Sequence, residues 1–157
     1  MNVLIIGGSG FIGKHLTYNF CKQKKYNVYS IDLKSSKKFL GKKNYVGDIK
    51  DSNFIKNCIK EVQPDLIYYL VSFFSFDDIS KSIRNSLIGL ENIFQNLVSK
   101  ERFIFIGSSA QYGKIPLDIQ PVSETSEFFP VSPYGVFKVS EEYEIRRLAT
   151  KYNVDFV

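Results

Sequence analysis

A chain of 157 residues in which 44% of the side chains are hydrophobic and 15% are aromatic has enough material for one domain with a sizeable core. This composition excludes a mainly disordered protein. The net charge of +5 leaves nucleic acid open as a partner. No arginine interleaves the lysine cluster, so a solvated loop is favoured, and a mild positive field would also suit an anionic substrate. The cluster consists of Lys34, Lys37, Lys38, Lys42 and Lys43.

Membrane, disulfide and metal classes find little support in the sequence. The first seven residues lack a basic region and a cleavage site, and the longest mainly apolar run, 66–76, is too short to cross a bilayer. We therefore expect a soluble, cytoplasmic protein that does not bind membranes. Cys21 and Cys58 fit buried helix positions better than a disulfide framework, and the single histidine, His15, leaves no ligand set for a metal.

Apolar strands alternate with amphipathic helices along the chain. The pattern predicts strands at Asn2–Ile6, Asn27–Asp32, near Tyr45 and Val46, at Asp65–Val71, Arg102–Ile106 and Val154–Val157, and helices at Phe11–Lys24, Ser52–Val62, Ile79–Lys100 and Tyr134–Tyr152. Near-continuous apolar strands of this kind are typical of a parallel sheet that is covered on both faces. The sequence therefore predicts one α/β domain with a doubly wound parallel sheet, a Rossmann fold over residues 1–157.

Residues 108–132 differ from this alternation. The segment holds Gly113, Pro116, Pro121 and Pro130, with serines and acidic residues between them. It is interpreted as a long ordered loop. Long loops inside compact domains usually carry function, so this one is a candidate part of the site.

A glycine motif follows the first strand and opens the first helix. Gly7, Gly10 and Gly13 allow the backbone to approach a pyrophosphate closely, and the N-terminus of the helix then binds its negative charge. Asp32 comes about twenty residues later, at the end of the next strand, as a ribose-binding acid would. Its carboxylate would accept hydrogen bonds from the ribose and repel a 2′-phosphate. The motif predicts NAD rather than NADP, although Lys34 and Ser35 weaken this preference.

A second motif lies near the C-terminus. Tyr134 and Lys138 are four residues apart on one predicted helix face, where they can act together. A phenol is a poor base at neutral pH unless a nearby positive charge stabilises the phenolate. Lys138 and the positive nicotinamide ring would supply that charge. Ser108, at the end of a strand, could hydrogen-bond the same substrate oxygen and orient it.

Taken together, these motifs resemble the N-terminal part of the extended short-chain dehydrogenase/reductase family, the NAD-dependent epimerase/dehydratase group that acts on nucleotide sugars. The resemblance covers essentially the whole chain: the glycine motif, Asp32, the pair Asp48-Ile49, the segments PDLIYYLVS and SSAQYG, and SPYGVFK.

The resemblance implies a role for each matching residue. The pyrophosphate would be held by Gly7, Gly10, Phe11, Ile12 and Gly13, the ribose by Asp32, and the adenine by Asp48 and Ile49. Leu70, Val71 and Ser72 would pass beside the cofactor. Tyr134 would be the base, Lys138 its partner and a ligand of the nicotinamide ribose, and Ser108, preferred to Ser109, the third catalytic residue.

The chain also departs from the family pattern. Tyr69 replaces the usual histidine, Val71 and Ser72 replace small alanines, and Ser86 stands where an asparagine is usual. The family continues for about as many residues again, and its C-terminal half normally builds the nucleotide-sugar pocket. The resemblance therefore implies a truncation, a fragment or a split gene product.

Ser109 and Ala110 stand where the family's dehydratases and decarboxylating members carry acids, so 4-epimerisation of a nucleotide sugar through a 4-keto intermediate is favoured. A 4-keto-sugar reductase remains open, as does a catalytically silent NAD-binding sensor or scaffold. Relatives pair two long helices into a dimer interface, and a homodimer is expected here. The apolar residues on these predicted helices are Ile83, Leu87, Leu90, Phe94, Val136, Val139 and Ile145.

Overall fold

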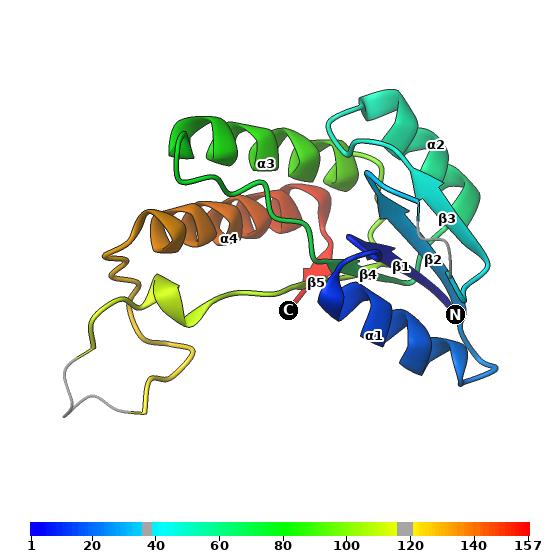
Figure 1. Ribbon diagram of the computed structural model, residues 1–157, viewed down its shortest axis with the longest axis horizontal. Coiled ribbons are helices and arrows are strands. Elements are labelled where there is room, and N and C mark those ends of the chain that lie inside the picture. The colour runs from blue at the N-terminus through cyan, green and yellow to red at the C-terminus, as the bar shows by residue number, and fades with distance from the viewer. Residues whose placement is uncertain (36–38, 116–120) are drawn as a thin grey trace.

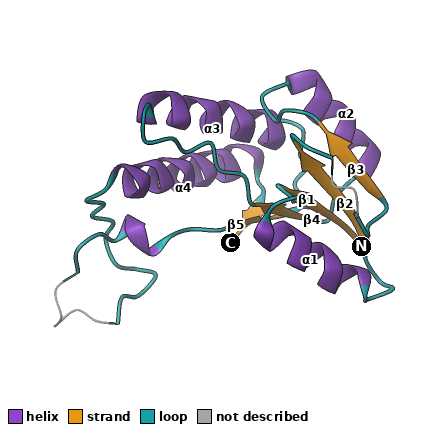
Figure 2. Cartoon of the chain, in the orientation of Figure 1, coloured by secondary structure: helices purple, strands orange, loops and turns teal. Residues whose placement is uncertain are grey.

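A single parallel sheet organises the part of the chain that the structure describes. The computed structural model describes residues 1–35, 39–115 and 121–157. Within them, six strands pair in the order β3-β2-β1-β4-β5-β6 (Figure 2). The strands are β1 (Asn2–Ile6), β2 (Asn27–Asp32), β3 (Lys43–Val46), β4 (Leu66–Tyr69), β5 (Arg102–Phe105) and β6 (Asp155–Phe156). The chain order reverses between β1 and β4, which creates a crevice at the carboxyl ends of these strands.

Helices cover both faces of the sheet (Figure 1). The helix α1 (Phe11–Cys21) lies on one face, and α2 (Ser52–Val62), α3 (Ile79–Phe94) and α4 (Pro133–Tyr152) lie on the other. The side chains of the strands alternate accordingly. Val3 and Ile5 pack toward α1 with Leu16 and Phe20, whereas Leu4 and other residues join the larger core beneath α2, α3 and α4. The predicted doubly wound α/β fold is confirmed.

Two of the predicted helices end earlier than expected. Helix α1 ends at Cys21 instead of residue 24, and α3 ends at Phe94 instead of residue 100. After α3 the backbone changes to tighter bonds, from Asn96 N–H to Ile93 O and from Leu97 N–H to Phe94 O. Ser99 then has a left-handed φ of 70°, which no helix can include. The polar and apolar pattern continues past the helix because the turn packs against the same core.

Strands β1 and β2 match their predicted bounds, but three others are shorter than predicted, since β4 spans 66–69, β5 ends at Phe105, and β6 contains two residues. The prediction of a loop over residues 108–132 misses a short 3₁₀ helix, η1 (Ser109–Gln111), which contacts α4. Residues 116–120, with Pro116, and residues 36–38, with Lys37 and Lys38, lie outside the described residues. Helix α2 matches its predicted bounds, with Asp51 capping its first turn.

Candidate cofactor and catalytic site

The turn between β1 and α1 requires glycine at two positions. Gly7 has a φ of 91°, a conformation that side-chain-bearing residues rarely adopt. A Cβ atom on Gly13 would lie 2.4 Å from the Gly7 carbonyl oxygen and 2.7 Å from the Cα of Gly8. The helix therefore packs directly on the turn. Gly10 is the N-cap of α1 and provides no side chain to cap the helix. The positive end of the helix dipole can therefore interact with a ligand in the adjacent cavity.

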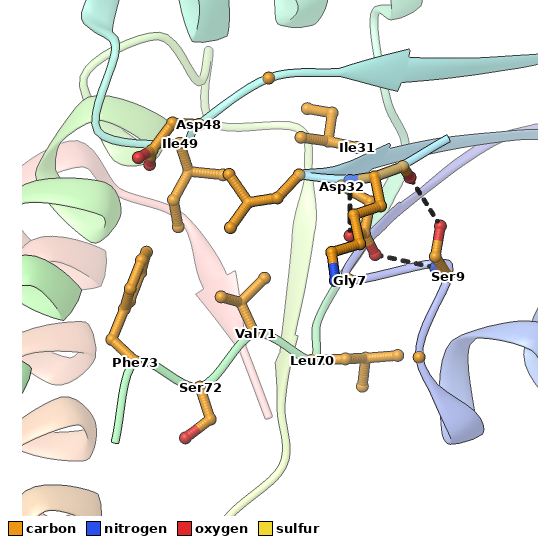
Figure 3. A pocket seen from close by; sticks show the side chains of 14 residues that line it. Gly7, Ser9, Ile31, Asp32, Asp48, Ile49, Leu70, Val71, Ser72 and Phe73 are labelled. Carbon is orange, nitrogen blue, oxygen red and sulfur yellow. Dashed lines mark hydrogen bonds between the residues drawn. The ribbon is translucent and has the colours of Figure 1, made fainter. Parts of the chain in front are cut away.

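Asp32 joins this turn to the end of β2. Its carboxylate accepts hydrogen bonds from the backbone N–H of Ser9 at 2.9 Å and from the backbone N–H of Lys34 at 3.3 Å. Ser9 also donates its hydroxyl to the Lys34 carbonyl, so the two loops are linked twice (Figure 3). A carboxylate has about four acceptor positions, and Asp32 therefore retains capacity for ribose hydroxyls.

The first cavity lies between this turn and the loop after β3, and has a volume of about 350 Å³. Figure 3 shows Asp48 and Ile49 along one side and Leu70, Val71, Ser72 and Phe73 along the other. Every adenosine-side residue that the sequence predicted, Asp32, Asp48 and Ile49, is in its lining. Ser9, Gly47 and Phe73 also line it and were not predicted. Phe73 directly continues the predicted run 70–72, which was the available signal.

The second cavity, of about 330 Å³, continues from the first. Both are lined by Gly7, Gly10 and residues 70–72, so these residues separate the two ends of one extended groove. Phe11, Ile12 and Gly13 line the second cavity, together with Tyr134 and Lys138 from α4. Residues that are more than a hundred positions apart in the sequence thus share one cavity at the carboxyl ends of β1 and β4.

Aromatic rings hold Tyr134 at this cavity. The ring of Phe74 meets that of Tyr134 edge-on with their centroids 5.1 Å apart, and Phe137 stacks at 6.5 Å. Tyr134 is half-buried, and Ser132 caps the helix that carries it by accepting the Gly135 N–H. The phenol is therefore fixed by packing on the first turn of α4.

Lys138 is tied to a buried carboxylate. Its ammonium donates to Glu141 Oε2 at 2.8 Å and lies 4.0 Å from the centroid of the Phe105 ring. The other oxygen of Glu141 accepts from the hydroxyl of Ser86, which lies 3.2 Å from the hydroxyl of Tyr69. Burial raises the pKa of Glu141, although the charge and hydrogen bond of Lys138 act in the opposite direction. Sequence reasoning did not identify Glu141 as a site residue.

Ser108 lies next to the second cavity rather than in its lining. The residues directly before it, Ile106 and Gly107, line that cavity. The hydroxyl of Ser108 accepts the N–H of Ala110 and its own N–H donates to Gln111, so that it caps η1. A hydroxyl that accepts in this way keeps its proton to donate elsewhere. The catalytic role of Ser108 stays a prediction.

The two cysteines lie in or beside helices and form no disulfide. Cys58 is buried in α2, Cys21 is half-buried at the end of α1, and both are free thiols. Within the described ranges, no cluster of three histidine, cysteine or acidic residues could hold a metal ion. Among these described residues, no helix is both long and apolar enough to span a bilayer.

The chain belongs to the NAD-dependent epimerase/dehydratase family, whose sequence profile matches residues 3–157. Among curated relatives, it is 27% identical over 156 residues to the UDP-glucose 4-epimerase of Lactobacillus helveticus, an alignment that covers 90% of this chain and 45% of that protein. The chain thus spans about half the length of the relatives that it matches. The predicted family resemblance is confirmed.

Solved structures give the same result. The UDP-glucose 4-epimerase of Thermotoga maritima, crystallised with UDP-glucose, matches with a TM-score of 0.85 and 25% identity over 99% of this chain and 53% of its own. The UDP-glucose 4-epimerase of Brucella ovis, in complex with NAD, matches with a TM-score of 0.84 and 25% identity over 99% of this chain and 50% of its own. The likeness is therefore to the N-terminal part of these proteins.

Proposed function

We propose that this chain binds NAD along the extended groove and provides the catalytic residues for 4-epimerisation of a nucleotide sugar. The observation that carries the proposal is that Tyr134 and Lys138 line the same cavity as the glycine turn. A phosphate-binding turn and a proton-transferring pair can act in the same reaction only if they lie at the same cavity. The relatives named UDP-glucose 4-epimerases support the substrate class.

The two cavities would together hold the two halves of a dinucleotide. The adenosine would lie in the first cavity, with its ribose on Asp32 and its base beside Asp48 and Ile49. The pyrophosphate would lie over Gly7 and the N-terminus of α1, where a side chain at Gly13 would disrupt the turn. The nicotinamide ribose would then reach the second cavity and Lys138.

Tyr134 would take the proton from the C4 hydroxyl of the sugar while the C4 hydrogen leaves as hydride. NAD held by the glycine turn, Asp32 and Lys138 would supply the redox chemistry at C4 that inverts the configuration of this carbon. Lys138 would support the phenolate electrostatically, and Ser108 would donate to the C4 oxygen. The same residues would serve reduction of a 4-keto sugar, which is the alternative reaction.

Binding of NAD without turnover is the second candidate function. The observation that favours it is the pairing of Lys138 with Glu141, because the positive charge that a phenolate needs already has a partner at 2.8 Å. In that case the protein would act as an NAD-responsive sensor or scaffold. Measurements of cofactor binding and of turnover on the same preparation separate the two functions.

Calorimetric titration with NAD and with NADP tests the cofactor assignment. We expect NAD to bind more tightly, because the Asp32 carboxylate would repel a 2′-phosphate. Asp32→Ala should narrow the difference between the two dissociation constants, whereas Asp77→Asn, at an exposed residue outside both cavities, should leave it unchanged. Tighter binding of NADP by the unchanged protein would refute the assignment.

We also propose a homodimer built on α3 and α4, which pack side by side. The predicted interface needs a correction, because three of its apolar residues are fully buried in the core of the chain itself: Leu90, Phe94 and Ile145. Their neighbours Ile83, Leu87 and Val139 are partly buried, while Ile88 and Val136 are exposed, at 43% and 40%.

Light scattering at micromolar concentration is expected to give the mass of a dimer. Ile88→Glu should shift the protein to a monomer, since it would bury a charge in the interface. Leu40→Glu, at an exposed residue that precedes β3, should leave the dimer intact. A monomeric mass for the unchanged protein at that concentration would contradict the proposal.

A further inference from the structure

Four polar side chains form a buried chain behind the second cavity. Tyr69 comes from β4, Ser86 from α3, and Lys138 and Glu141 from α4. Their exposed fractions are 1%, 0%, 5% and 0% respectively. Buried polar groups destabilise a protein unless each is hydrogen-bonded, and here hydrogen bonds connect all four. A fully connected network of this kind holds its members in fixed positions.

Each link of the chain has a defined direction. Lys138 donates to one oxygen of Glu141 at 2.8 Å, and Ser86 donates to the other at 2.5 Å. Because the single proton of Ser86 is used in this way, the hydroxyl of Tyr69 must be the donor to Ser86. Burial raises the pKa of Tyr69, which keeps that phenol protonated. The carboxylate of Glu141 is therefore held at both oxygens.

This fixed carboxylate limits where the Lys138 ammonium can lie. The ammonium has three N–H donors, of which one bonds to Glu141, while the ring of Phe105 lies on another side at 4.0 Å. Lys138 nevertheless lines the second cavity. A lysine without such an anchor would sample many rotamers and would lose that freedom when it bound a ligand.

We propose that Glu141 is a positioning residue that holds Lys138 ready for the nicotinamide ribose, with Ser86 and Tyr69 fixing its carboxylate. The inference rests on the proposed binding of NAD. It adds that the affinity of the pocket depends on a carboxylate that touches neither the cofactor nor the substrate. Such preorganisation raises affinity because the ordering of the side chain precedes binding.

A double-mutant cycle on NAD affinity tests this inference. In Glu141→Gln, the amide N–H₂ replaces the oxygen that accepts from Lys138 or the one that accepts from Ser86, so one donor faces another donor. We expect NAD to bind roughly tenfold more weakly, because the Lys138 side chain would then have to be ordered when NAD binds. In the Lys138→Met background, the same substitution should change the affinity by less than about twofold, because the ammonium it positions is gone.

Glu144→Gln is the matched control, since Glu144 lies on the same helix and pairs with Arg147 outside both cavities. It should leave NAD affinity unchanged. Equal losses from Glu141→Gln in both backgrounds would show a merely structural role and overturn the inference while NAD binding stands. A wild-type protein that does not bind NAD would instead overturn the proposed function, and the inference with it.

Ser86→Ala keeps the test decisive if Glu141→Gln does not fold. This substitution frees one oxygen of Glu141 but leaves the ion pair with Lys138 in place. We expect a smaller loss of affinity, of about threefold, that disappears in the Lys138→Met background. An undiminished loss in that background would contradict the inference in the same way.

Discussion

Replacement of Tyr134 by phenylalanine is expected to lower turnover of a UDP-hexose by about 10²–10⁴-fold, the usual contribution of a positioned proton-transferring group. The substitution removes only the hydroxyl. The edge-on contact with Phe74 and the stacking with Phe137 involve the ring and should survive. NAD affinity should change much less than turnover. The measurement is 4-epimerisation by the longest natural reading frame that contains these residues.

Tyr143→Phe is the control for this prediction, because Tyr143 is exposed on the same helix and lies outside both cavities, with its ring centroid 6.1 Å from that of Phe128. It should keep full activity. Full activity in Tyr134→Phe would remove Tyr134 as the base. If residues 1–157 alone bind NAD without turnover, the binding-only function applies to this piece.

Gly13→Ala is expected to have the largest effect on the fold and on NAD binding together. The new methyl group would meet backbone atoms of Gly7 and Gly8 at 2.4 and 2.7 Å, and backbone cannot move aside as a flexible side chain can. Overpacking of this kind costs about 3 kcal/mol of unfolding free energy. The displaced turn should also lose its affinity for the pyrophosphate. Urea unfolding and NAD titration measure the two effects.

Gly10→Ala provides a graded comparison within the same turn. Its Cβ would meet only the Gly7 carbonyl oxygen, at 3.2 Å, and its φ of −72° is open to alanine. The loss of stability should therefore be smaller than for Gly13→Ala. Equal stability and equal NAD affinity in all three proteins would mean that the close approach of α1 to the turn is not required.

Local patterns in the sequence predicted most of the fold. The strand, glycine turn and helix at the N-terminus are determined by neighbouring residues, and Asp51 marks the start of α2 in the same way. The end of α3 was missed because no glycine marks it, and the left-handed residue that follows the helix is a serine, Ser99. The 3₁₀ helix after β5 depends on Gln111, whose side chain also donates to Glu142 on α4.

Only the site residues that belong to sequence motifs could be predicted. Asp32, Asp48, Tyr134 and Lys138 could be placed by their spacing and by the family resemblance, and all four line the groove. The role of Glu141 depends on contacts among β4, α3 and α4. Its spacing from Lys138 also occurs on any solvated helix, where such a pair is a weak surface contact. Only packing distinguishes the buried pair from the exposed ones.

Ionic strength acts differently on these two kinds of pair. Glu91 on α3 meets Arg147 and Lys151 of α4 at the surface, where dissolved ions screen electrostatic interactions with a Debye length of about 10 Å at 0.1 M salt. The pair of Lys138 and Glu141 is nearly buried, with side-chain exposures of 7% and 1%, so dissolved ions screen it much less. Added salt therefore weakens the ion pairs between the outer surfaces of α3 and α4 more than it weakens the pair of Lys138 and Glu141. A rise in ionic strength would therefore loosen the surface contacts between α3 and α4 before it changes the position of the Lys138 ammonium.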